Sequence, residues 1–262
     1  TPEFTFSSEA GARFECSLDA AAFAACDSAL TTSPLLDGAH TFAVRAIDAA
    51  GNTDGTPATR AFTVDTASPQ TTIVAAPSAL TTDSTPTFEF ESEDGATFEC
   101  SLDAGAFTSC TSPLTTGVLA DGAHTFEVWA VDAAENADAT PAGRDFTLDT
   151  STPETSIDSG VSGLTSSTGA SFTFSASEAA TFQCSLDAGD FAACTSPQGY
   201  VGLSDGAHSF QVRATDAAGN ADSSPASSSW TVDTTAPDTT IQQGPAGLTG
   251  DPTPTFEFGA TD

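Results

Sequence analysis

The sequence predicts an all-β chain of tandem antiparallel β-sandwiches arranged end to end. The first observation is an internal repeat: the pattern Phe-x-Cys-Ser-Leu-Asp around Cys16 returns around Cys100 and Cys184, at intervals of 84 residues and without insertion or deletion. The second is a period-two alternation of apolar and polar residues in short segments. The third is a set of turns rich in Asp, Gly and Asn between those segments, with no sustained helical period.

The second copy illustrates the elements in order. In residues 98–102 the apolar side chains share one face, and in residues 124–132 Phe126, Val128 and Ala130 do the same. The predicted strands cover residues 71–74, 87–91, 98–102, 106–110, part of 112–119, 124–132 and 145–149. Seven short strands in a unit of this length predict an immunoglobulin-like antiparallel sandwich.

The repeat also predicts the domain organisation. Pro69, Pro153 and Pro237 occupy one register, just after each closing strand. The predicted domains are residues 1–68 (repeat 1, first strand missing), 69–152 (repeat 2), 153–236 (repeat 3) and 237–262 (partial repeat 4, first two strands). Because short linkers that contain Pro do not behave as flexible coil, neighbouring repeats of the same or an identical chain are expected to be held end to end.

The composition excludes several classes of partner. All 19 Phe occupy a few fixed positions of the repeat, so each copy is expected to build its own core. The chain carries 36 Asp and Glu against five Lys and Arg, for a net charge of −31. Such a chain repels nucleic acid and anionic membrane surfaces. No apolar run approaches the ~20 residues of a membrane-spanning helix.

The cysteines fall into three equivalent pairs, each ten residues apart: Cys16 and Cys26, Cys100 and Cys110, Cys184 and Cys194. On a β-rich background this spacing predicts cross-strand disulfides, with the partners opposite one another on a hairpin. Disulfides point to an oxidising, extracellular or cell-surface location. A zinc site is the rival, but each pair lacks nearby Cys or His to complete four ligands. Each bridge is expected to contribute about 2–3 kcal/mol by loop entropy.

The polar residues form no catalytic constellation. His40, His124 and His208 lie at one position of the repeat, so no two can meet within one domain. Each follows an Asp-Gly turn and faces inward, which predicts a corner hydrogen bond to the backbone. The cysteines are committed to disulfides and no Gly-x-Ser-x-Gly motif is present, so no nucleophile accompanies the histidines. The sequence therefore predicts a non-enzymatic protein.

The asparagines mark a candidate metal site. Every Asn lies in the pattern Asp-Ala-Ala-x-Asn-x-Asp between the last two strands of a copy. In the predicted topology this loop meets the last Asp of the preceding copy, so oxygen ligands from both are available for calcium. The candidate ligands are Asp65, Glu93, Asp132, Asn136 and Asp138 at the first junction, and Asp149, Glu178, Asp216, Asn220 and Asp222 at the second. The alternative is that these residues only make turns and loop hydrogen bonds. No other cofactor is expected.

Four motifs carry a family resemblance over the whole chain. Phe-x-Cys-Ser-Leu-Asp, Asp-Gly-Ala-His-x-Phe-x-Val, Asp-Ala-Ala-Gly-Asn and Val-Asp-Thr-Thr-Ala-Pro together resemble the bacterial immunoglobulin-like repeats of large secreted and cell-surface proteins. The resemblance implies a tandem spacer or adhesin-type architecture at the bacterial surface.

Two functional hypotheses follow. The first is a non-enzymatic extracellular structural array: a rigid stalk or filament of disulfide-stapled domains, with calcium stiffening the junctions. The alternative is an adhesin binding module that recognises a glycan or protein ligand. Trp129, which stands where the other copies have Arg45 and Arg213, is the one residue that would mark such a contact, although packing under a neighbouring loop is the favoured explanation.

The two ends are complementary pieces of the repeat. Repeat 1 lacks the strand that matches residues 71–74, whereas residues 239–241 supply such a strand without the rest of a sandwich. Two strands alone do not bury the apolar face that they carry. Either the polypeptide continues at both ends, or the tail of one chain completes the first domain of the next by strand addition. The uninterrupted register favours continuation.

Overall fold

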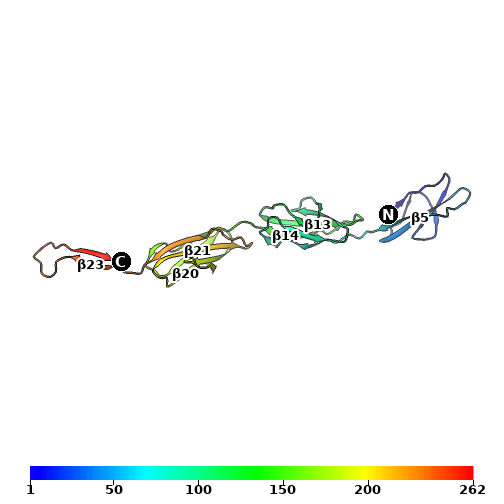
Figure 1. The fold of residues 1–262 in the computed structure, drawn as a ribbon. Coiled ribbons are helices and arrows are strands. Elements are labelled where there is room, and N and C mark those ends of the chain that lie inside the picture. The colour runs from blue at the N-terminus through cyan, green and yellow to red at the C-terminus, as the bar shows by residue number, and fades with distance from the viewer. Residues whose placement is uncertain (262) are drawn as a thin grey trace. The chain divides into compact units, whose positions relative to one another are not determined.

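A computed structural model describes residues 1–261, which leaves the last residue of partial repeat 4 outside the description (Figure 1). The regular elements of these residues are all strands. Their bounds are β1 Glu3–Phe4, β2 Arg13–Leu18, β3 Ala24–Cys26, β4 Leu30–Thr31, β5 Gly38–Ile47, β6 Ala58–Val64, β7 Thr72–Ala75, β8 Leu80–Thr81, β9 Thr87–Glu91, β10 Thr97–Leu102, β11 Thr108–Cys110, β12 Leu114–Thr115, β13 Gly122–Val131, β14 Ala142–Leu148, β15 Thr155–Ser159, β16 Gly163–Thr165, β17 Ala170–Ala176, β18 Ala180–Leu186, β19 Ala192–Cys194, β20 Gln198–Tyr200, β21 Gly206–Asp216, β22 Ala226–Val232, β23 Asp238–Gln243 and β24 Glu257–Thr261.

The chain divides into two compact units. Unit 1 comprises Thr1–Ala79, Thr85–Leu119 and Ala123–Thr147, and unit 2 comprises Leu80–Ser84, Ala120–Gly122 and Leu148–Asp262. Repeat 3 lies wholly in unit 2, so it displays the complete sandwich. One sheet has the order β15-β17-β20 and the other has the order β16-β22-β21-β18-β19. The fold is therefore an immunoglobulin-like β-sandwich, as predicted.

The complete sandwich has one strand more than predicted. β16 is only three residues long and pairs parallel with β22, so that the leading segment crosses from one sheet to the other. The segment Gly163–Thr165 carries no alternating pattern long enough to indicate a strand, which explains why sequence inspection missed it. In the same way β11 and β14 have bounds that differ from the predicted ones by two or three residues.

Unit 1 contains the corresponding strands of repeats 1 and 2. In repeat 2, β12-β9-β7 form one sheet and β11-β10-β13-β14 are consecutive strands of the other. In repeat 1, β1 and β4 form a two-stranded sheet and β3-β2-β5-β6 form a four-stranded sheet. The described residues of repeat 1 form no strand that corresponds to β7.

The aromatic positions of the repeat meet between the two sheets. In repeat 2 the ring of Phe88 stacks on Phe126 with centroids 4.0 Å apart, and both side chains are fully buried. In repeat 3 the equivalent pair Phe172 and Phe210 stacks at 4.2 Å. Trp230 packs against Phe172 where the other repeats have Phe, so the larger ring is accommodated in the same place.

Every residue of the Cys-Ser-Leu-Asp motif has a structural partner. In repeat 2, Cys100 lies in the core, and the buried Ser101 hydroxyl donates to the backbone oxygen of Gly105 in the following turn. Leu102 packs against the core, and the Asp103 carboxylate accepts a hydrogen bond from the backbone N–H of Thr125. The motif thus fixes the turn between β10 and β11.

The three predicted disulfides are present. Cys16–Cys26, Cys100–Cys110 and Cys184–Cys194 each join neighbouring strands. The sequence predicts that the two cysteines of a pair lie directly opposite one another, and this part of the prediction is wrong. In repeat 2, Cys100 faces Thr108 and Cys110 faces Phe98, so the bridge runs diagonally across the ladder by two residues. Because the offset is an even number of residues, both cysteines stay on one face of the ladder, where Cys100 is part of the core and Cys110 packs against it.

A further contact joins two motifs that are distant in sequence. The Asp121 carboxylate, in the Asp-Gly-Ala-His motif, accepts hydrogen bonds from the backbone N–H and the hydroxyl of Thr150, which ends the Leu-Asp-Thr motif. Asp205 and Thr234 repeat the arrangement in the next copy. The recurrence of both motifs at one period is thereby explained.

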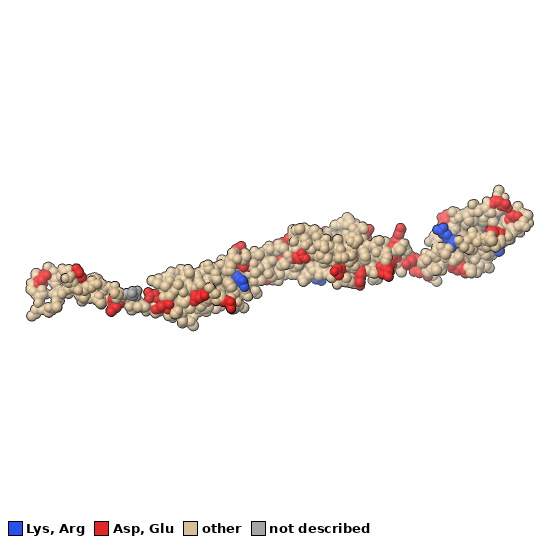
Figure 2. Space-filling model, viewed as in Figure 1, with Lys and Arg blue, Asp and Glu red and all other residues tan. Residues whose placement is uncertain are grey.

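Acidic side chains are spread over every part of the chain (Figure 2). On the face shown, carboxylates are scattered over the surface, whereas Lys and Arg side chains show at only a few places. Within residues 1–261, no helix has the length and apolarity that crossing a membrane would require.

Candidate functional site

The loop between the last two strands of each repeat is organised by its first Asp. We call it the Asp–Asn loop and define it as residues 132–140 in repeat 2 and 216–224 in repeat 3. The Asp132 carboxylate accepts hydrogen bonds from the backbone N–H groups of Ala134 and Asn136 and from the Asn136 side-chain amide. Asp216 accepts a similar set, from the backbone N–H groups of Gly219 and Asn220 and from the Asn220 side-chain amide. This is the loop-forming role of Asp and Asn.

The last Asp of the loop holds the leading strand of its own repeat. Asp138 is 2% exposed, and one of its oxygens accepts from the backbone N–H of Thr71 at 2.8 Å. Its other oxygen accepts from the N–H and hydroxyl of Thr140. In repeat 3, Asp222 bonds to Thr155 in the same way, at 3.1 Å. These carboxylates already have hydrogen-bond donors.

The Asn side chain reaches the segment that precedes the repeat. In unit 1, Asn136 Nδ2 donates to the backbone oxygen of Asp65 at 3.1 Å. In unit 2, Asn220 Nδ2 donates to the backbone oxygen of Asp149 at 2.9 Å. The predicted meeting of Asp65 with Asn136, and of Asp149 with Asn220, is thus observed, although it uses backbone oxygens.

Hydrogen bonding keeps the loop carboxylates ionised. The Asn136 amide lowers the pKa of Asp132, with further help from backbone N–H groups. Burial opposes ionisation of Asp216 and Asp138, but hydrogen bonds from Asn220 and from Thr140 respectively outweigh it and lower both pKa values. The loops therefore present permanently anionic oxygens at neutral pH.

One group of carboxylates converges. Oxygen atoms of Asp149, Glu178 and Asp216 all lie within 4.8 Å of one another, and among residues 1–261 this is the one such group. Asp216 is buried and Glu178 is exposed. Oxygen donors at these separations are of the kind that calcium prefers. Asn220 borders the group through its bonds to Asp149 and Asp216.

The corresponding residues at the first junction do not converge in this way. Glu178 is matched in register by Asp94, and not by Glu93, which stands one residue earlier in an exposed turn. Asp94 has a side chain one methylene shorter than Glu178. Asp65, Glu93 and Asp132 form no such cluster in the described residues.

The histidines make the predicted backbone bond and one that was not predicted. His208 Nε2 lies 2.8 Å from the backbone oxygen of Ser204, and its Nδ1 lies 2.9 Å from the Asp187 carboxylate. His40 has the equivalent pair in Leu36 and Asp19. Sequence inspection missed the Asp because it is 21 residues away, although it recurs at the same period.

Both neighbours of each ring are hydrogen-bond acceptors, which favours the doubly protonated imidazolium. The backbone oxygen of Ser204 and then the Asp187 carboxylate raise the pKa of His208. Leu36 and Asp19 do the same for His40. Each ring thus links the Asp carboxylate of one hairpin to a backbone oxygen of the preceding loop. All cysteines are bridged, so no thiol accompanies the His–Asp pair.

Trp129 is engaged by its own sheet face. Its indole stacks on Phe107 with centroids 4.6 Å apart, and its Nε1–H donates to Glu99 at 2.9 Å. Arg45 and Arg213 occupy this position in the other repeats and lie over Phe23 and Phe191. In each repeat the side chain at this position therefore packs on a Phe ring. This agrees with the expectation that Trp129 is packed within its own repeat.

Comparison with known proteins gives structural likeness only. No protein-family model matches the sequence, and no curated protein matches it. Similar solved structures include the fibronectin(III)-like modules of Clostridium thermocellum CbhA, with 17% identity over 62% of this chain and 94% of that chain and a TM-score of 0.37. A 1.5-MDa bacterial ice-binding adhesin matches at 16% identity over 85% and 87% of the two chains, with a TM-score of 0.41.

A calcium-stabilised adhesin of an Antarctic bacterium matches at 18% identity over 88% of this chain and 68% of that chain, with a TM-score of 0.37. All three scores lie below 0.5, so the fold assignment rests on the strand order and registers given above. By these criteria the chain is a tandem array of immunoglobulin-like β-sandwich repeats.

Proposed function

We propose that this chain is a non-enzymatic spacer: part of an extracellular or cell-surface stalk whose domains are the repeats defined by sequence. The observation that carries the proposal is the anchoring of each connecting segment. In repeat 2 the Asp–Asn loop bonds the oxygen of Asp65 through Asn136 and the N–H of Thr71 through Asp138. Both ends of the segment 65–71 are thereby fastened to one loop.

Repeat 3 supports the same proposal independently. Asn220 and Asp222 bond to Asp149 and Thr155, so the segment 149–155 is fastened at both ends as well. A connecting segment that is hydrogen bonded at both ends loses most of the conformational freedom that a linker of its length would have. Each repeat also has its own aromatic core and disulfide, as expected of an independently folded domain in a stalk.

Calcium is the second part of the proposal. The Asp149, Glu178 and Asp216 group is proposed to bind Ca²⁺ at the second junction, with Asn220 alongside. Asp149 comes from the connecting segment and Asp216 from the following loop, so an ion held by both would restrain the connection while each core folds without it. Clustered carboxylates without an ion would repel one another.

Solution scattering of the whole chain tests the spacer. We expect an elongated particle with a well-defined maximum dimension, and an Asn136→Ala/Asn220→Ala double variant that is more flexible. A wild-type profile of a freely bending chain, equal to that of the double variant, would contradict the proposal. The matched control is Asp94→Ala, because Asp94 is exposed and bonds to neither connecting segment.

Calorimetric titration with calcium, and scattering in calcium and then in chelator, test the ion. We expect saturable binding and a change in flexibility on chelation. Absence of binding, together with an unchanged maximum dimension, would identify the carboxylates as solubilising charge and leave the spacer proposal standing on its hydrogen bonds.

The adhesin alternative is not favoured by a specific observation. Trp129 bonds within its own sheet, and no other aromatic cluster is exposed on repeats 1 to 3 in the described residues.

A further inference from the structure

Asp is followed directly by Gly at five places in the chain: residues 37–38, 54–55, 94–95, 121–122 and 205–206. At such a step the backbone nitrogen of Gly can attack the side-chain carboxyl carbon of Asp, because Gly has no Cβ to hinder the approach. The nitrogen and the Asp side chain then close a succinimide ring. These steps are therefore candidate sites for one spontaneous reaction of the backbone.

The reaction needs no reagent other than water. Ring closure forms the bond between the Gly nitrogen and the Asp Cγ, and the carboxyl oxygen leaves as water with the amide hydrogen. Water then adds to one of the two ring carbonyl carbons. Addition at Cγ restores Asp, whereas addition at the former backbone carbonyl gives isoaspartate, in which the backbone passes through Cγ and the α-carboxylate is free.

The three steps in the Asp-Gly-Ala-His motif are held at both reacting groups. The Asp205 carboxylate accepts from the N–H and the hydroxyl of Thr234, at 3.1 and 2.8 Å. Gly206 stands opposite Val232 in the ladder between β21 and β22. Neither the carboxyl group nor the nitrogen is therefore free to approach the other. The equivalent pairs of Asp and Thr are Asp37 with Thr66 and Asp121 with Thr150.

The step at Asp54 is held at its carboxylate alone. This carboxylate accepts from the backbone N–H of Thr56 at 2.8 Å and from its hydroxyl at 2.9 Å. The side chain is thus fixed on the residue beyond Gly55, which itself lies outside the strands. We expect this step to react more slowly than one whose carboxylate is free.

The step at Asp94 is held at neither group. Asp94 is exposed, and its carboxylate accepts no hydrogen bond within residues 1–261. It lies in a turn that is closed by the N–H of Ala96 and the oxygen of Glu93 at 3.3 Å, slightly beyond the usual range. Gly95 has a φ of +85°, and no atom lies within 4 Å of the point where a Cβ would stand. The nitrogen of Gly95 is therefore open to attack on the Asp94 carboxyl carbon.

The other repeats carry different residues at this step. Repeat 1 has Ala10 and Gly11, and repeat 3 has Glu178 and Ala179. Ala has no carboxyl group, and a Glu side chain would close a larger ring, which forms more slowly. The reactive pair is thus a feature of repeat 2.

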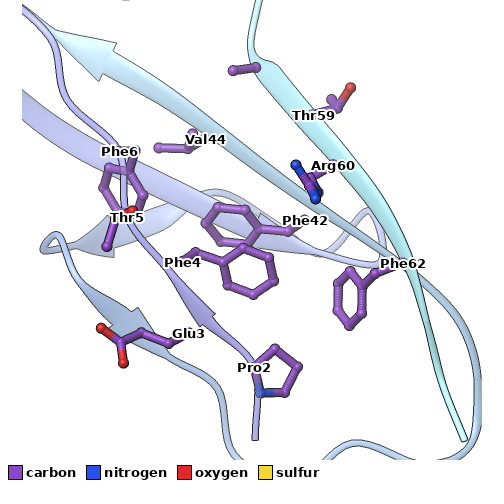
Figure 3. A pocket seen from close by; sticks show the side chains of 11 residues that line it. Pro2, Glu3, Phe4, Thr5, Phe6, Phe42, Val44, Thr59, Arg60 and Phe62 are labelled. Atoms are coloured by element: carbon purple, nitrogen blue, oxygen red, sulfur yellow. The ribbon is translucent and has the colours of Figure 1, made fainter. Parts of the chain in front are cut away.

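Repeat 1 nevertheless supplies a matched turn. Gly11 has a φ of +84°, and the N–H of Ala12 donates to the oxygen of Glu9 at 3.2 Å. The turn belongs to a sandwich with the same aromatic core, in which Phe4 lies face to face with Phe42 at a centroid distance of 4.1 Å (Figure 3). The turns of repeats 1 and 2 therefore share their geometry and differ at the reactive position.

We propose that Asp94 is a site of spontaneous isoaspartate formation in the folded protein, and that hydrogen bonds suppress the same reaction at the other Asp–Gly steps. The modified turn carries a new free carboxylate and a backbone longer by one carbon atom. The inference is independent of the spacer proposal, because Asp94 bonds to neither connecting segment.

The first test follows all these steps in the whole folded chain, with its disulfides intact, during incubation at neutral pH. Samples are then reduced, alkylated and digested with chymotrypsin, which isolates residues 91–98 by cleavage after Phe90 and Phe98. An isoaspartyl peptide has the mass of its parent, so it is identified by its separate elution and by electron-transfer fragmentation.

We expect isoaspartate to accumulate at Asp94 at least about tenfold faster than at the three steps of the Asp-Gly-Ala-His motif. The loss of one charge-assisted hydrogen bond accounts for a factor of about that size. The step at Asp54 should fall between these limits.

The second test removes the fold. The same chain is incubated in denaturant with its disulfides reduced, where none of the hydrogen bonds from Thr persists. The steps should then react at similar rates, because each has the same Asp–Gly sequence. This comparison separates the effect of the structure from that of the neighbouring residues.

The third test transfers the site. An Ala10→Asp chain places Asp before Gly11 in the matched turn of repeat 1, and it should form isoaspartate there at a rate close to that of Asp94. Adding Asp94→Glu to this chain keeps the charge of repeat 2. It should abolish the reaction within residues 91–98 and leave the new site unchanged.

Three outcomes would overturn the proposal. A rate at Asp94 no higher than at the steps bonded to Thr would show that free and held carboxylates react alike. A difference that persists in denaturant would assign it to neighbouring residues and not to the fold. An Ala10→Asp chain that stays unmodified at residue 10 would show that this turn does not permit the reaction.

Discussion

The Asp–Asn loops of repeats 2 and 3 share their hydrogen bonds and differ in the reach of one carboxylate. In both loops the first Asp accepts from the backbone and from Asn, and the last Asp holds the leading strand. Among the described residues, three carboxylates converge only in repeat 3, where Glu178 stands in the register of the shorter Asp94 of repeat 2. The two loops can therefore be compared for cation binding through this one differing residue.

The largest expected effect concerns the part that the two loops share. Asp138→Ala and Asp222→Ala each remove a buried carboxylate that bonds to a backbone N–H, and each should destabilise its own repeat by about 3 kcal/mol. Trp129 and Trp230, the only two Trp residues, report repeats 2 and 3 separately in fluorescence-detected unfolding. Asp94→Ala is the matched control in repeat 2, since Asp94 is exposed and bonds to no leading strand. A loss of stability in Asp138→Ala that is no larger than in Asp94→Ala would contradict this role of the last Asp.

The next effect tests the difference between the loops. Glu178→Asp should weaken calcium binding at the second junction at least about tenfold, because a shorter side chain withdraws one of the three oxygens. The reciprocal change Asp94→Glu should add a weak site at the first junction. Calorimetric stoichiometry checks both. If Glu178→Asp binds calcium as well as the wild type does, the comparison drawn from side-chain reach is wrong.

A smaller effect is expected from the asparagines. Asn220→Ala and Asn136→Ala each remove the hydrogen bond to the preceding segment, which should cost about 1 kcal/mol. The Asn220 change should be the larger, because its bond to Asp149 is shorter and less exposed than that of Asn136 to Asp65. Protease cleavage of the connecting segments, read by mass spectrometry, measures the loosening. Cleavage at an unchanged rate in both variants would refute the anchoring.

The smallest effects are expected from pH. The pKa values of Asp132 and Asp216 are lowered on folding, so their contribution is complete above the unfolded value of about 3.9 and is lost as pH falls through the folded value. The pKa of His208 is raised, so its contribution is complete below about 6.5 and is lost as pH rises through the folded value.

Unfolding midpoints measured against pH should therefore be highest between these limits. His208→Gln should flatten the alkaline side of the profile for repeat 3, read through Trp230, and leave the acid side unchanged. A wild-type alkaline limb that persists in this variant would show that another group is responsible.

Much of the fold could be predicted because three copies of the repeat show the same alternation of apolar and polar residues. The strands with clear alternation, such as residues 98–102 and 124–132, lie within β10 and β13. β8 and β16 were missed because a strand of two or three residues is defined by its neighbour and not by its own pattern. The disulfide pairing was correct, but its diagonal register depends on the pleat of the finished hairpin.

The candidate site was predictable only as a set of residues. The Asp-Ala-Ala-x-Asn-x-Asp pattern and its position identify the loop and its meeting with Asp65 and Asp149. Which atoms meet was not predictable, because Asn uses its amide on a backbone oxygen, and Asp138 and Asp222 turn to the leading strand. Glu93 is not the counterpart of Glu178, because the period of the repeat places Asp94 in that register.

The sequence by itself determined the repeat, the all-β class, the cysteine pairs and the acidic surface, because periodicity, spacing and charge are properties of the chain before it folds. Tertiary structure decided which carboxylates converge and why each His is hydrogen bonded to an Asp 21 residues away. Those features depend on distances between side chains from different strands. Such distances follow from sheet register and packing, which only the folded sandwich establishes.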